Sequence, residues 1–220
     1  MQMITSKLKS FGMVYQMAKK SSLPTLATVI LFYLRKRHGV NILANPKDSV
    51  KGISNISTPG IFNAVLTCGA IDGTEPTMID VEGRLRLLGD FALGRGCRLD
   101  IGPQATVTIG HGTYINPHSQ CVIKHALTIG EHCAISWECQ FLDEDFHVLT
   151  YDGRKTTGTN AISIGDRVWI GSRVSVYKGT VIPDGCVIAS NSVVKGVFTE
   201  KNSLIAGNPA RVIKNNVKWT

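Results

Sequence analysis

Apolar residues recur at every sixth position in one stretch of this chain, and this period restricts the fold more than any other feature. The ladder consists of Ile164, Ile170, Val176, Ile182, Ile188 and Val194. A second ladder lies two residues earlier and changes from apolar to small: Ile162, Val168, Val174, Thr180, Cys186 and Ser192. A period of six fits neither an α-helix, with about 3.6 residues per turn, nor the alternation of a hairpin sheet. It fits a chain that winds into coils and stacks like residues upon like.

The repeat pattern divides the chain into a body and its flanks. We predict an all-β solenoid, a parallel β-helix of hexapeptide repeats, over residues 79–207. The pattern breaks after Phe141, and the polar, turn-rich segment 142–161 predicts a loop extruded from one corner of the coil. Functional residues often lie on such loops, because the scaffold holds their base. Residues 208–220 are predicted to form a cap in which Pro209 begins a short helix that covers the open end.

The region before the repeats has a different composition. Residues 1–51 are predicted to form a basic helical arm, whose second helix begins near Pro24 and ends at Gly39. Residues 52–78 are rich in Gly, Asn, Ser and Thr, which indicates an irregular lead-in of short strands and loops.

The net charge of +8 lies entirely in this arm. Residues 1–51 carry nine basic residues and one acid, and the rest of the chain is balanced. The neutral body and the lack of a nucleic-acid motif argue against nucleic-acid binding. Two interpretations of residues 1–40 remain open: peripheral contact with an anionic membrane surface, or a helical pair that packs on its own assembly.

The cysteines and the apolar runs bound the compartment. The six cysteines contain no C-x-x-C pair, so a zinc site built from them is disfavoured and we expect buried free thiols. The apolar run Leu23–Leu34 is shorter than the roughly twenty residues that a spanning helix needs. We therefore expect a cytoplasmic protein, with the inner membrane face as a peripheral site if the arm docks there.

Three segments carry a resemblance to a known family. They are ISIGDRVWIGSRVSVYKGTVIPDGCVIASNSVV, the tail GNPARVIK, and DEDFH at the start of the loop. With them the chain resembles the hexapeptide-repeat acyltransferases, and the sugar and polysaccharide O-acetyltransferases in particular. The resemblance implies a left-handed β-helix, a homotrimer with shared sites, acetyl-CoA as co-substrate and a saccharide acceptor. It does not specify which acceptor.

His147 is the first candidate catalytic residue. Transfer of acetyl to a hydroxyl needs a base, and an imidazole exchanges a proton readily near neutral pH. The family's catalytic histidine lies on this loop, and His147 is the only histidine there. Asp143, Glu144 and Asp145 precede it, and the family pattern favours Asp145 as the carboxylate that supports the imidazole. A solvated acidic turn is the alternative for any one of the three.

Tyr114 and Asn116 match residues that line the acceptor pocket of the galactoside-type enzymes. An Asn side chain can both donate to and accept from sugar hydroxyls. Turn chemistry before Pro117 explains the Asn equally well. Lys124 stands where that family has an acid, so we expect an acceptor other than a simple galactoside.

Trp169, Ser172 and Ala189 match positions that contact CoA in the family. The small Ala189 would let the pantetheine arm lie close to the backbone, and the Ser172 amide could donate to a developing oxyanion. Ordinary coil packing is the alternative, above all for Trp169.

Basic residues near the C-terminal end are candidates for the phosphates of CoA. They are Lys195, Arg211 and Lys214. The basic residue that the family places directly after Lys195 is Gly196 here, which leaves the register of that contact open.

Four histidines recur every seven residues, at His111, His118, His125 and His132. The β-helical carbonic anhydrases hold zinc with histidines, so a zinc enzyme is one rival interpretation. Seven matches neither the strand step nor a full coil, so the four cannot form one ligand column, and we expect no metal. The other rivals are N-acetylation of a nucleotide-linked amino sugar and a non-catalytic trimeric scaffold.

Overall fold

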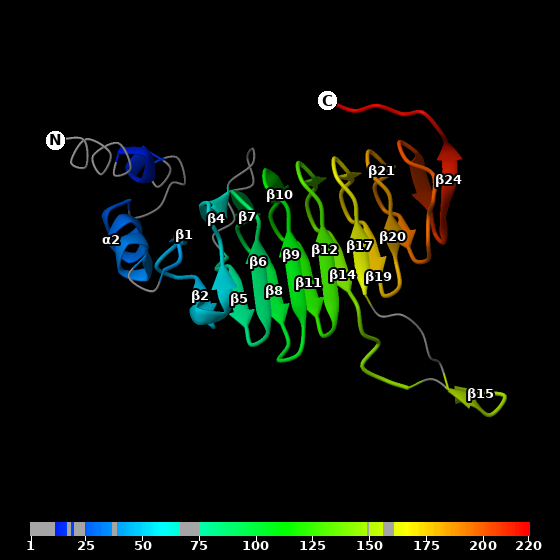
Figure 1. Cartoon of the computed structure of the whole chain (residues 1–220), viewed down its shortest axis with the longest axis horizontal. Helices are drawn as coiled ribbons and strands as arrows, with labels where there is room; N and C mark the ends of the chain where they lie inside the picture. The colour runs from blue at the N-terminus through cyan, green and yellow to red at the C-terminus, as the bar shows by residue number, and fades with distance from the viewer. Residues whose placement is uncertain are drawn as a thin grey trace.

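The protein folds as a solenoid whose coils form three flat faces (Figure 1). This computed structural model describes residues 12–16, 19, 25–36, 39–66, 75–148, 150–155 and 161–220. Successive coils stack along one axis with parallel pairing. The predicted all-β, mostly parallel architecture is confirmed, and it fits a left-handed β-helix.

Three sheets, here called A, B and C, form the faces. Sheet A has nine strands in the order β1 (Ile42–Leu43), β4 (Phe62–Leu66), β7 (Phe91–Gly94), β10 (Thr113–Ile115), β13 (Ala134–Ile135), β18 (Trp169–Ile170), β21 (Val187–Ile188), β23 (Leu204–Gly207) and β24 (Ala210–Lys214). Sheet B has seven: β2 (Ser49–Lys51), β5 (Met78–Val81), β8 (Arg98–Ile101), β11 (Gln120–Ile123), β14 (Gln140–Leu142), β19 (Ser175–Tyr177) and β22 (Val193–Val194). Sheet C has six: β20 (Val181–Ile182), β17 (Ile162–Ile164), β12 (Ala126–Ile129), β9 (Thr106–Ile109), β6 (Arg84–Leu87) and β3 (Ile56–Ser57).

The two six-residue ladders point into the prism, as their period predicts. Every member of both is buried, and together with the earlier coils they form one continuous core. Trp169 pairs with Val187, so a regular coil is eighteen residues long, with three strands of six. The earlier coils are longer, since Tyr114 pairs with Ala134 and Thr113 with Phe91. The core is a stack of like residues, which is how a solenoid buries apolar surface without long-range crossovers.

The solenoid begins earlier in the chain than the sequence indicates. The repeat body was predicted from residue 79, but β1 and β2 already pair in parallel with β4 and β5. Residues 42–61 therefore form the first coil, which starts before the predicted boundaries at 51 and 78. The physical reason is that lateral pairing with the next coil holds these strands, so they need no regular six-residue repeat.

The predicted loop leaves the prism between β14 of sheet B and β17 of sheet C (Figure 1). It carries a small antiparallel hairpin, β15 (Thr150–Tyr151) with β16 (Arg154–Lys155). The hairpin projects away from the coils in Figure 1, and Ile162 resumes the stack by pairing with Leu127.

The C-terminal segment is a strand and not the predicted short helix. Gly207, with a φ of 106°, lies at the turn after β23, and β24 pairs antiparallel with β23. Pairing with the exposed edge of the last coil satisfies backbone groups that a helix would leave open. The capping role predicted for residues 208–220 is thus filled by a hairpin.

The N-terminal arm packs on the first coil through one helix. Helix α2 (Thr25–Lys36) ends near Gly39, as predicted, and it buries Val29 and Phe32 against Leu43. Residues 12–16 form a helical turn whose Val14 joins the same cluster. The part of the first predicted helix in residues 1–11 lies outside the described residues. No helix within the described ranges is long and apolar enough to cross a membrane.

Candidate functional site

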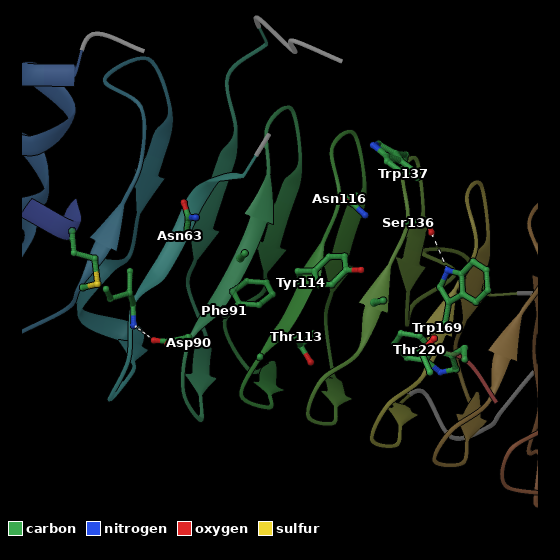
Figure 2. Close-up of a pocket in the computed structure, with 16 residues that line it drawn as sticks. Asn63, Asp90, Phe91, Thr113, Tyr114, Asn116, Ser136, Trp137, Trp169 and Thr220 are labelled. Atoms are coloured by element: carbon green, nitrogen blue, oxygen red, sulfur yellow. Dashed lines mark hydrogen bonds between the residues drawn. The ribbon is translucent and has the colours of Figure 1, made fainter. Parts of the chain in front are cut away.

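A groove of about 770 Å³ runs over the outer surface of sheet A (Figure 2). Its lining comes from the N-terminal turn, five successive coils and the last residues of the chain. The lining residues are Met13, Ile61, Asn63, Asp90, Phe91, Ala92, Gly112, Thr113, Tyr114, Asn116, Ala134, Ser136, Trp137, Trp169, Trp219 and Thr220.

The floor of the groove is one row of outward-facing residues. The row consists of paired neighbours on adjacent strands of sheet A: Asn63, Ala92, Tyr114, Ala134 and Trp169. Alternation along a strand turns these side chains outward, because their neighbours in sequence face the core. Tyr114 is 39% and Trp169 41% exposed, so large aromatic surface remains open to a ligand.

Polar side chains follow the floor at the corner between sheets A and B, here called the A–B corner. Asn116 is buried, and its Nδ2 donates to the Ile135 carbonyl at 3.0 Å. Trp169 reaches the same corner, where its Nε1 donates to Ser136 Oγ at 3.3 Å. The structure thus brings together the predicted acceptor residues Tyr114 and Asn116 and the predicted CoA residue Trp169.

Ser172 and Ala189 lie at the same corner in the next two coils. Ala189 donates its amide to the Ile205 carbonyl and is half-buried. The Ser172 carbonyl accepts from the Asn191 amide, whereas the Ser172 amide donates to no group in the described part of the chain. The predicted donation from this amide to a developing oxyanion stays a prediction.

The three basic residues that are predicted to bind the phosphates of CoA do not lie together within one chain. Arg211 and Lys214 lie on β24, at the end of sheet A, and both are exposed. Lys195 is also exposed but follows β22 of sheet B, at the corner between sheets B and C, here called the B–C corner. A phosphate group cannot be assigned to all three within a single chain.

Asp143 anchors the base of the extruded loop. It is fully buried, and its carboxylate accepts three backbone hydrogen bonds from Lys124, His125 and Ala126 at 2.7–2.8 Å. These amides belong to the turn between β11 and β12, one coil away. Asp143 therefore ties the loop to the B–C corner, which accounts for one of the three acids by structure alone.

The other two acids also have partners at that corner. Glu144 lies 2.7 Å from His125 Nε2, and this hydrogen bond holds the pKa of the Glu144 carboxyl below its ordinary value. Asp145 forms an ion pair with Lys178 at 2.6 Å. His147 follows on the exposed part of the loop. Asp145 contacts Lys178 and not His147 in the described part of the loop, so its supporting role stays a prediction.

The four histidines with spacing seven lie at three corners. His111 and His132 meet edge to face with ring centroids 5.6 Å apart, at the corner between sheets C and A. His118 lies near Glu75 and His125 near Glu144, at the other two corners. The described residues contain no group of three His, Cys, Asp or Glu arranged to hold a metal ion.

The described cysteines are buried free thiols, as predicted, while Cys68 lies outside the described residues. Burial raises the pKa of Cys133 and Cys139 to about 11 and that of Cys97 to about 12. A thiol with a raised pKa is a poor nucleophile at neutral pH, so these cysteines are unsuited to form an acyl-enzyme.

The sequence did not single out Trp137 or Trp219 as site residues. Both line the groove, and Trp219 arrives from the far end of the chain with its ring centroid 6.2 Å from that of Trp169. One signal was available: the chain has three tryptophans, and all three lie at this groove.

Known proteins show the same features. Residues 161–196 match the family model described as bacterial transferase hexapeptide (six repeats). An uncharacterised 24.8 kDa protein of the Klebsiella pneumoniae cps region is 38% identical over 81% of this chain and 81% of its own length. WbbJ of Escherichia coli K12, provisionally named a lipopolysaccharide biosynthesis O-acetyl transferase, is 30% identical over 63% of this chain and 76% of its own.

A solved structure has the same fold. The polysialic acid O-acetyltransferase OatWY superposes with a TM-score of 0.59 over 81% of this chain and 86% of its own, at 21% identity. The family model and the named relatives define a class, the transferases built from hexapeptide coils. The chain belongs to the hexapeptide-repeat acyltransferase family and is an acyltransferase.

Proposed function

We propose that this protein is an acetyl-CoA-dependent O-acetyltransferase that acts on a saccharide in surface polysaccharide or lipopolysaccharide synthesis. The relatives that carry such names support the saccharide and the pathway. The exposed aromatic floor and polar corner of the groove support a sugar acceptor.

The distribution of the candidate residues over the prism carries the proposal. One group belongs to the B–C corner: His147, Asp145 and Lys195. The other group belongs to sheet A and its A–B corner: Tyr114, Asn116, Trp169, Ser172 and Ala189. In a three-sided prism the B–C corner lies opposite sheet A. The two groups meet only if the loop of one chain reaches the groove of another, as in a homotrimer of left-handed β-helices with shared sites.

The loop histidine supplies the proton transfer. His147 removes the proton from the acceptor hydroxyl as the oxygen bonds to the acetyl carbonyl carbon. The Ser172 amide donates to the carbonyl oxygen while it carries negative charge. When the carbon–sulfur bond breaks, the imidazolium returns the proton to the sulfur, so the products are the acetyl ester and free CoA.

The residues of the A–B corner fit acetyl-CoA, which supplies the activated acetyl thioester when bound. The side chain of Ala189 is small and half-buried, which leaves the corner open to a slender chain. Trp169 offers an apolar wall beside this corner. The exposed Arg211 and Lys214 lie further along sheet A, on β24, where we expect them to bind the phosphate groups of CoA.

Substitution of His147 tests the proposal. We expect His147→Ala to lower turnover at least about a hundredfold, because general-base catalysis contributes that much or more. Affinity for acetyl-CoA and oligomer mass should not change, and His132→Ala, at the corner between sheets C and A, is the matched control. The assay follows the release of the free CoA thiol with saccharide acceptors matched except for a hydroxyl or an amino group. Wild-type turnover in His147→Ala would refute the assignment, and a preference for the amine would favour N-acetylation.

The N-terminal arm is expected to make a second contact, with the surface of a membrane. Helix α2 docks on the coil with one face and exposes Leu26, Ile30 and Leu34 to 73%, 50% and 45% on another. These residues lie four apart, on one stripe, and the helix ends in Arg35 and Lys36. An apolar stripe within a segment of charge +8 suits the surface of an anionic bilayer.

Vesicle binding tests this contact. We expect co-sedimentation with vesicles that contain phosphatidylglycerol, and weaker binding in high salt or with neutral lipid. A Leu26→Ser, Ile30→Ser, Leu34→Ser variant should lose binding but keep activity on a water-soluble acceptor. A change in oligomer mass without any loss of vesicle binding would assign the stripe to contacts between copies.

A further inference from the structure

The groove on sheet A is rich in aromatic side chains, and its lining restricts the kind of acceptor that it fits. Tyr114 lies on its floor, and Trp137 and Trp169 lie toward one end (Figure 2), with Trp219 beside Trp169. A pyranose ring presents a face of C–H bonds, which packs well on aromatic rings.

The end wall of the groove comes from the tail of the chain. After β24 the chain turns back, and Val217 donates its amide to the Asn202 carbonyl at 2.8 Å. Trp219 then donates its Nε1–H to the Arg167 carbonyl at 2.9 Å and lies beside Trp169. These bonds hold the indole at the groove.

Two buried polar atoms at the groove have no partner among the described residues. They are Asn116 Oδ1, an acceptor, and Trp137 Nε1, a donor. Both residues line the groove at its A–B corner. An unsatisfied buried group is costly, and a sugar hydroxyl carries both a donor and an acceptor. A bound sugar can therefore satisfy atoms that the protein alone leaves open.

Within one chain, the described lining of the groove offers no cation to neutralise an anion. None of these lining residues is Lys, Arg or His, and the one acidic side chain is that of Asp90, whose Oδ1 accepts from the Ile61 amide at 2.8 Å. Transfer of a carboxylate into such a groove would cost free energy without an ion pair in return. The named polysialic acid enzymes act on an anionic polymer, so this groove predicts a different preference.

We infer that the groove on sheet A binds an uncharged saccharide segment of the acceptor, with Trp137, Trp219 and Asn116 as its recognition residues. This inference rests on the proposed acetyl transfer but can be measured apart from it. Binding of the saccharide changes the surroundings of all three tryptophans, and it needs neither acetyl-CoA nor turnover.

Tryptophan fluorescence with defined oligosaccharides tests the inference. We expect neutral oligohexoses to change the emission and to bind with a Kd at least about tenfold lower than that of sialic acid or uronic acid oligomers of equal length. Trp137→Phe keeps the ring but removes the donor, and it should weaken neutral binding while acetyl-CoA affinity stays the same. Trp219→Phe should bind better than Trp219→Ala.

A charge variant sharpens the result. Ala92→Lys adds a cation to the groove floor and should shift preference toward anionic oligomers, whereas Ala92→Gln should not. Tighter binding of anionic oligomers by the wild type, or no saccharide binding, would overturn the inference. So would loss of oligomer mass in Trp137→Phe without an effect on saccharide binding, since the groove would then be an interface between copies. Failure of the proposed function is distinct: the chain would not bind acetyl-CoA.

Discussion

Residues at equivalent positions of successive coils differ in polarity and size. Four residues occupy the same place at the A–B corner, since the amide of each donates to the carbonyl of an isoleucine in the next coil. They are Asn116, Ser136, Gly171 and Ala189. The first two are polar and line the groove, and the last two are small. The column is polar where we propose the acceptor and small where we propose the slender arm of the donor.

The buried thiols predict how stability depends on pH. Burial raises the pKa of Cys97, Cys133 and Cys139 above the ordinary value of 9.0. Above about pH 9 the unfolded chain therefore loses these protons first, and the free energy of unfolding falls as pH rises toward 11 to 12. This contribution is fully present below pH 9.

Urea denaturation at pH 7 and pH 10 measures this dependence. We expect lower stability at pH 10, and a smaller difference in a Cys139→Ala variant, which removes one of the titrating thiols. An equal difference in wild type and variant would contradict the assignment. At neutral pH, alkylation of these thiols should be slow in the native protein and rapid in denaturant.

At the scale of elements, the extruded loop is held more firmly at its base than its exposed tip suggests. The base rests on Asp143 with its three backbone hydrogen bonds, on the Glu144–His125 hydrogen bond and on the Asp145–Lys178 ion pair. This base sets where the His147 segment leaves the prism.

Replacement of Asp143 should therefore affect both stability and activity. Asp143→Ala leaves three amides without their acceptor, and each unsatisfied buried group costs about 1–3 kcal/mol. Asp145→Ala removes a partly exposed ion pair and should cost less than about 1 kcal/mol. Thermal denaturation and turnover of the two variants provide the comparison. Equal destabilisation by both variants would show that Asp143 does not anchor the loop.

The regular coils were predictable, whereas the first coil and β24 were not. The ladder from Ile164 to Val194 specifies the stack, because a period of six has one structural explanation. The first coil and β24 have no such pattern, since pairing with a neighbouring coil stabilises them. Trp219 was equally hidden, because it reaches the groove only through the turn after β24.

At the scale of the whole molecule, one chain holds an incomplete set of candidate groups. His147 extends from the B–C corner, and the groove lies on the opposite face. The sequence could name most of these residues from the family pattern, yet it could not show that they occupy separate sides of the prism. That separation emerges only when the coils are stacked, and it makes assembly a condition for activity in our account.

Subunit complementation tests this central claim most directly. His147→Ala lacks the base but keeps the groove, and Ala189→Tyr blocks the donor corner but keeps the loop. Each variant alone should be inactive. Oligomers reassembled from equal amounts of both should regain about a quarter of wild-type turnover, because a mixed trimer has one site with both intact parts and some trimers are unmixed. Intact oligomers without any recovered activity would contradict the account, since the site would then lie within a single chain.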